Sequence, residues 1–189
     1  YLLEADDGYD ESWKFTTANY IPFLFKDDGN DEMLSYATSF VRGVEDKLYA
    51  GNYSAAYEQL DLTSFADFWL IQEIMMNSEM KHPKSVYMYL NRGTIYAGPI
   101  WDFDWNTLPV STSYAEEGYS YTKSMLEKAK PYHKRSGYPN EPIEDDDKNY
   151  VWYPMLVKDA TFKALTAERW GQVKNMLLSY VETIPAKAA

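Results

Sequence analysis

Two carboxylates stand two residues apart in the stretch Gly98–Trp105, which reads GPIWDFDW. In an extended backbone residues i and i+2 project to the same face, so Asp102 and Asp104 are predicted to converge on one cation. The three flanking aromatic rings would then face the other way and anchor the segment in a core. Carboxylate oxygens bind divalent metals, and such metals commonly serve phosphate chemistry. The structural alternative is a partly buried Asp pair that caps a turn.

A second polar segment, residues 77–85, has the sequence NSEMKHPKS. It brings a carboxylate, an imidazole and two ammonium groups into one short loop, a mixture that can supply a base, a phosphate-steering cation and a metal ligand. The structural alternative is a polar connection between a helix and a strand, in which His82 is an ordinary hydrogen-bonded loop residue. The chain has no Ser-His-Asp spacing, no phosphate loop and no dinucleotide-binding glycine motif.

Short strands are predicted on both sides of these segments. Five stretches are rich in β-prone residues and bounded by turn signals: 1–6, 13–17, 21–26, 85–90 and 94–98. The first three predict a small antiparallel sheet. The last two are joined by Asn91-Arg92-Gly93, in which glycine can take positive φ, and they predict a hairpin that leads directly into the Asp102 segment.

Helices are predicted for most of the remaining chain. Apolar residues recur every three or four positions from Met33 to Leu48, and Asn30 or Asp31 can cap this helix. Residues 61–64, beginning with Asp61, supply N-cap candidates for a strongly apolar helix that is predicted to be buried and to run to about Met76. Further helices are predicted at 53–60, 150–157 and 159–184, the last interrupted near Thr166 and ended by Pro185. These patterns together predict an α+β fold with a small antiparallel sheet and a mostly helical body.

Composition narrows the class of protein. A chain of 189 residues with 46% hydrophobic content fits one domain with a sizeable core. Its formal charge of -11 argues against nucleic acid as a partner, because a phosphate backbone would be repelled. The absence of cysteine excludes disulfides and thiolate metal sites. The 18 Tyr and 6 Trp residues favour half-buried surfaces and ligand grooves.

Residues 106–150 have weak periodicity and several Gly and Pro residues, and are predicted to form a long loop or lid over the site. No apolar run reaches the roughly 18 residues that a membrane span needs. The chain opens as a strand from its first residue, so we expect it to begin inside a larger protein, with any export signal upstream.

Several segments together resemble the spore-coat CotH kinase family, in its large bacterial branch outside spore formers. They are Tyr1–Glu4, Trp13–Phe15, the helix from Asp61 to Asn77, His82–Tyr89 (HPKSVYMY) and Ala97–Asp104 (AGPIWDFD). The tyrosine strand followed by Pro-x-Trp-Asp-x-Asp is a fairly specific signature. Residues 162–170 are similar to the family's closing helix, so the likeness covers most of the chain apart from the long loop.

The resemblance implies a diverged protein-kinase-like fold that uses ATP and Mg²⁺ (or Mn²⁺) to phosphorylate protein side chains. It aligns Asp102 with the family's metal-binding Asp, and Asp104 with a neighbouring ligand or positioning group. Glu79 stands where the family has its catalytic-loop Asp, which orients and deprotonates the acceptor hydroxyl. Lys84 stands where a kinase loop offers Asn to a second metal ion; a lysine cannot bind metal but can hold phosphate. Both departures would impair phosphoryl transfer.

The resemblance also implies one domain over residues 1–189, whose upstream part, with the nucleotide-clamping Lys, lies outside this sequence. Two other functions remain open. One is a non-catalytic binding or scaffolding module of a secreted or cell-surface protein, whose tyrosine-rich face takes carbohydrate or protein. The other is a metal-dependent phosphohydrolase that uses the Asp pair. The acceptor protein is not indicated by the sequence.

Overall fold

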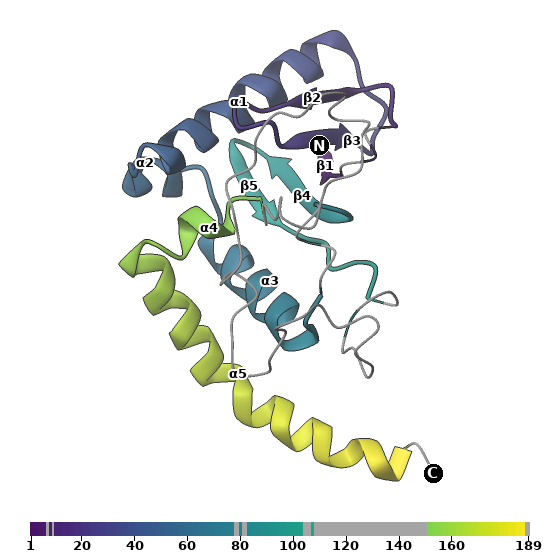
Figure 1. Ribbon diagram of the computed structural model, residues 1–189, viewed down its shortest axis with the longest axis vertical. Coiled ribbons are helices and arrows are strands. Elements are labelled where there is room, and N and C mark those ends of the chain that lie inside the picture. Colours follow the sequence, from purple (N-terminus) through teal and green to yellow (C-terminus); the bar gives the residue numbers. More distant parts are fainter. Residues whose placement is uncertain are drawn as a thin grey trace.

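The computed structural model describes residues 1–6, 8, 10–77, 80, 83–103, 107 and 151–187. Over these residues the chain combines one five-stranded antiparallel sheet with five helices (Figure 1). The α+β class predicted from the sequence is confirmed.

The sheet joins strands from two distant parts of the chain. Its strands are β1 (Leu2–Ala5), β2 (Lys14–Thr16), β3 (Pro22–Phe25), β4 (Val86–Asn91) and β5 (Thr94–Ala97), in the order β2-β3-β1-β4-β5. Strand β1 pairs with β3 on one side and with β4 on the other, so Glu4 lies between Leu24 and Tyr87. The predicted hairpin is therefore an extension of the N-terminal sheet rather than a separate element.

The helices are α1 (Asp31–Tyr49), α2 (Tyr53–Tyr57), α3 (Leu62–Met75), α4 (Tyr153–Leu156) and α5 (Ala160–Lys187). Two of them begin at the predicted caps. Asn30 accepts a hydrogen bond from the Met33 N–H at 2.9 Å, and Asp61 accepts one from the Ser64 N–H at 2.8 Å. These side chains satisfy N–H groups that the first helical turn leaves unpaired.

The core lies between one face of the sheet and the helices, and large aromatic rings occupy its centre. Trp152 is fully buried, with the rings of Phe23 and Phe65 at 6.1 and 6.3 Å between centroids. Tyr153 packs beside it, stacked on Trp69 at 4.9 Å. The segment just before α4 thus connects the sheet to α3.

Glu45, on the inner face of α1, is a carboxylate with no solvent exposure. One oxygen accepts hydrogen bonds from the backbone N–H and the side-chain amide of Asn19, at 3.1 and 2.8 Å. The other accepts from the Trp152 indole at 2.9 Å. A buried carboxylate is tolerated when such donors replace its water, and this one connects three segments of the chain.

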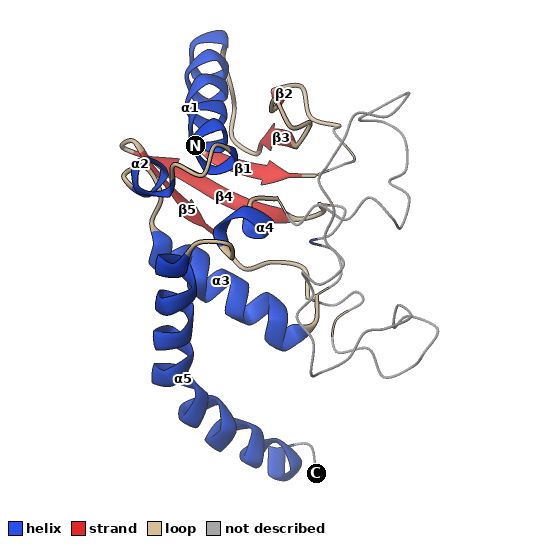
Figure 2. Cartoon of the chain, turned by 60° about the vertical axis from the view of Figure 1, so that its left-hand side comes forward, coloured by secondary structure: helices blue, strands red, loops and turns tan. Residues whose placement is uncertain are grey.

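Helix α5 packs along α3 at its N-terminal end and then extends past it (Figure 2). Asp159 caps α5 by accepting hydrogen bonds from the N–H groups of Thr161 and Phe162, at 2.9 and 3.1 Å. It also accepts the Tyr57 hydroxyl at 2.9 Å. This one side chain therefore connects α2 to the start of α5.

Two sequence predictions for the last helix are wrong. Thr166 does not interrupt α5, which is continuous from Ala160 to Lys187 although the Thr166 hydroxyl donates to the Phe162 carbonyl at 2.9 Å. Pro185 does not end it either, since α5 continues to Lys187. A proline in the last turn removes only one backbone hydrogen bond, and at this exposed end water can take its place.

The loop or lid predicted at 106–150 lies outside the described residues, apart from Thr107. Within the described part of the chain, none of the helices has both the length and the apolarity that crossing a membrane requires.

Candidate functional site

The strand register brings Ser85 and the described residues after β5 to the same end of the β4–β5 hairpin. Ala97 lies opposite Met88, and the Gly98 N–H donates to the Tyr87 carbonyl at 2.9 Å. The chain therefore leaves β5 beside the point where it enters β4. Ser85, which directly precedes β4, is thus placed next to the residues that follow Gly98.

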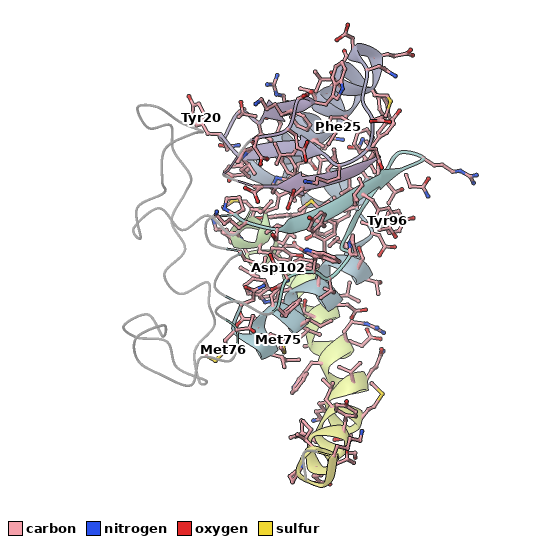
Figure 3. All side chains as sticks on the ribbon, turned by 90° about the vertical axis from the view of Figure 1, so that its right-hand side faces the viewer. Tyr20, Phe25, Met75, Met76, Tyr96 and Asp102 are labelled. Carbon is pink, nitrogen blue, oxygen red and sulfur yellow. The ribbon has the colours of Figure 1, made fainter. Side chains whose placement is uncertain are left out.

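Asp102 lies where the chain leaves the β4–β5 hairpin, next to Ser85, and we call this place the Asp102 corner. A side-chain contact holds Asp102 there. The Ser85 hydroxyl donates a hydrogen bond to Asp102 Oδ2 at 3.1 Å, and the carboxylate is half-buried. Figure 3 shows Asp102 below the strands, on the side of the sheet where α3 ends near Met75. A carboxylate that is partly open and directed by a neighbour can accept a ligand from solvent.

Asp102 and Ser85 both have left-handed backbones, with φ of 62° and 51°. Non-glycine residues rarely adopt this conformation, and such residues cluster at functional sites. It also corrects the predicted geometry: the segment is not extended at Asp102, so the simple i, i+2 rule does not apply there. Asp104 itself lies outside the described residues.

At Trp101 the structure corrects the expectation that the flanking rings anchor the segment in a core; Trp105 lies outside the described residues. The Trp101 side chain is 61% exposed and touches Tyr87 edge-on, with ring centroids 6.5 Å apart. Because the backbone turns at the next residue, this ring lies on the surface beside Asp102. Contacts with Tyr87 and Ser85 thus help to position the segment, whereas burial of Trp101 does not.

Tyr87 belongs to a polar cluster on the sheet that sequence reasoning missed. Its hydroxyl donates to Glu4, which is 5% exposed, and Lys26 reaches Glu4 at 3.0 Å and Glu11 at 2.7 Å. Burial raises the pKa of Glu4, and the hydrogen bonds from Lys26 and Tyr87 offset part of that rise. The sequence did contain a signal for this cluster: Glu4 lies in the middle of a short apolar strand, and a buried carboxylate needs hydrogen-bonding partners.

Burial, followed by the charge of Glu4, raises the pKa of Tyr87 to about 12. The hydroxyl therefore stays protonated at neutral pH and remains a donor to Glu4. This fixes the tyrosine ring against which Trp101 rests.

The segment that carries Glu79 has buried residues on both sides of it, Asn77 and Met80. Helix α3 ends at Met76 with φ 51°, and the Asn77 N–H donates to the Gln72 carbonyl at 3.1 Å. Glu79 and His82 lie outside the described residues, as does His133 in the long loop. Lys84 is exposed and directly precedes Ser85, so a cation is attached to the Asp102 corner by the chain itself.

One described carboxylate, Asp102, could contribute to holding a magnesium ion together with ligands from a nucleotide. Among the described residues, no group of three His, Cys, Asp or Glu side chains could hold a metal by itself. Mg²⁺ at such sites is bound by one or two carboxylates, with waters and substrate phosphates as its other ligands. Asp102, half-buried and hydrogen-bonded to Ser85, could supply one such carboxylate ligand.

Comparison with known proteins identifies the family of the chain. A family model described as CotH kinase protein matches residues 1–186. No curated protein and no solved structure matches the chain.

Proposed function

The chain belongs to the CotH kinase protein family, and from that premise we propose that it transfers the γ-phosphoryl group of ATP to protein side chains with the help of Mg²⁺ or Mn²⁺. The family match supports a kinase-like fold and an atypical kinase-like function. The observation that carries the finer proposal is Asp102, a half-buried carboxylate with a left-handed backbone, held by Ser85 at the exit of the β4–β5 hairpin.

Each proposed residue has a separate task. Asp102, aided by Asp104, holds the metal ion. When bound, that ion neutralises charge on the nucleotide's phosphate oxygens. Lys84, a flexible cation beside the corner, pairs with a phosphate oxygen and steers it. Glu79 orients the acceptor hydroxyl and takes its proton.

Two features of this set predict slow chemistry. Glutamate is one methylene longer than the family's aspartate, and a displacement of about 1 Å at a reacting group can cost roughly 100-fold in rate. Lys84 replaces an amide that would bind a second metal ion, so charge neutralisation at that point comes from an ammonium group. The expected activity is therefore well below that of a typical protein kinase.

The direct test is transfer of radiolabel from [γ-³²P]ATP to protein, measured with Mg²⁺ and with Mn²⁺. The wild type should label protein, Glu79→Asp should raise the rate, and Asp102→Asn should abolish labelling. Release of labelled phosphate without protein labelling would instead support a metal-dependent phosphohydrolase. Neither labelling nor release, in a folded protein, would contradict phosphate chemistry altogether.

A second candidate is a non-catalytic binding module, as in a secreted or cell-surface protein. It is supported by aromatic rings on the sheet and beside it: the exposed Tyr89 stacks on the half-buried Tyr96 at 4.7 Å, and Trp101 is mostly exposed. Exposed aromatic rings suit carbohydrate or protein partners. A Tm that rises with glycans and does not respond to ATP with Mg²⁺ would favour this function over phosphotransfer.

A further inference from the structure

Ser85 has an unusual set of properties for a loop serine. Most side-chain hydrogen bonds go to the backbone or to water, whereas the Ser85 hydroxyl donates to the carboxylate of Asp102, far along the chain. Ser64 provides the ordinary case: its hydroxyl donates to the Asp61 carbonyl and accepts from the Ala97 N–H, both backbone groups.

Both partners adopt a backbone conformation that L-residues avoid. Ser85 has φ 51° and Asp102 has φ 62°. Glycine would take either conformation without strain, yet at both positions the chain has a residue with a polar side chain. The hydroxyl and the carboxylate are therefore presented to each other by two strained residues that flank a well-paired hairpin.

From this geometry we propose that Ser85 is a positioning residue for the metal ligand Asp102. Its donated hydrogen bond fixes the direction in which the carboxylate faces, as neighbouring groups around metal sites commonly do. The inference rests on the proposed function only in its use of Asp102 as a ligand, and it does not require that phosphate is transferred.

Three variants can separate the role of the Ser85 hydroxyl in metal binding from any effect on folding. Ser85→Gly removes the hydroxyl and relieves the left-handed strain, so the protein should fold at least as well as the wild type. Ser85→Asn keeps a donor, and asparagine tolerates this backbone conformation. Ser64→Ala is the matched control, because it removes hydroxyl contacts that serve only the fold.

The experiment measures binding of Mn²⁺ alone by the electron paramagnetic resonance of the free ion, beside the Tm of each variant. Ser85→Gly should weaken Mn²⁺ binding about 10-fold without a fall in Tm. Ser85→Asn should recover part of the affinity. Ser64→Ala should lower Tm and leave Mn²⁺ affinity unchanged.

The outcomes separate this inference from the proposed function. Wild-type affinity in Ser85→Gly, or an equal loss of affinity in Ser64→Ala, would overturn the role of Ser85 alone. Mn²⁺ binding that follows the expected order, in a protein that transfers no phosphate, would support Ser85 and contradict the kinase activity. A wild type that binds no Mn²⁺ would overturn both.

Discussion

Two carboxylates of this chain have opposite surroundings. Glu45 is completely buried in a regular helix, with three donors from Asn19 and Trp152 around its oxygens. Asp102 is half-buried, has a left-handed backbone and receives the hydroxyl of Ser85. The fold encloses Glu45 completely, whereas Asp102 is oriented by Ser85 and stays partly open to solvent. Glu45 therefore serves the fold, whereas Asp102 is the better candidate for a ligand-binding acid.

The largest expected effect is on the enclosed acid. Glu45→Gln turns one acceptor into a donor and sets it against a buried N–H group, so the free energy of unfolding should fall by about 2 kcal/mol. Urea unfolding monitored by tryptophan fluorescence measures this change. The neighbouring exposed Asp46→Asn is the matched control and should change little. Equal effects at the two positions would show that the Asn19 and Trp152 contacts do not matter.

A smaller effect on the free energy of unfolding is expected at Asp159. This carboxylate is partly exposed, unlike Glu45, but serves the fold as a helix cap. Burial alone would raise its pKa, but hydrogen bonds from Phe162, Tyr57 and Thr161 outweigh that and hold the pKa below its usual value. Asp159→Ala should lower the free energy of unfolding by about 1 kcal/mol at pH 7, as is typical for loss of a helix cap.

The pH dependence of the Asp159 effect has a definite sign. A carboxyl with a lowered folded-state pKa contributes its stability above the unfolded pKa and loses it as pH falls through the folded pKa. The difference between wild type and Asp159→Ala should therefore hold from pH 7 to about pH 4 and shrink below that. A difference that grows on acidification would contradict the assigned hydrogen bonds.

Local signals in the sequence predicted the elements well. Asn30 and Asp61 cap the helices they were predicted to cap, because a capping contact depends on residues only three positions away. The five strands also lie within the predicted stretches or one residue beyond them. The pairing of β1 with β4 was not predictable, since it joins residues more than eighty positions apart and depends on the packing of the whole sheet.

The site was only partly predictable for a similar reason. The Pro-x-Trp-Asp-x-Asp pattern made Asp102 a candidate ligand. The alternation of side chains that was assumed for this pattern requires an extended backbone, whereas Asp102 is left-handed and Trp101 is exposed. The contact with Ser85 arises from the hairpin register. Glu45 gave no signal, because a glutamate on a helix is usually a surface residue.

The smallest expected change in stability is at Asp102, where the effect on ligand binding should be the greatest. Asparagine keeps an oxygen that can accept the Ser85 hydroxyl, so the free energy of unfolding of Asp102→Asn should stay within about 0.5 kcal/mol of wild type. Most of the affinity for a divalent ion should be lost with the charge. Urea unfolding checks the first part of this prediction.

The most direct test of the central claim is the Tm of wild type and Asp102→Asn with ATP, in the presence and absence of Mg²⁺. The wild type should show its largest rise in Tm when ATP and Mg²⁺ are both present, because a ligand that binds the native state alone raises its stability. Asp102→Asn should melt at the same temperature under all conditions. A wild type that ignores Mg²⁺ and ATP, or a variant that responds as strongly as wild type, would contradict the assignment of Asp102 as the metal ligand.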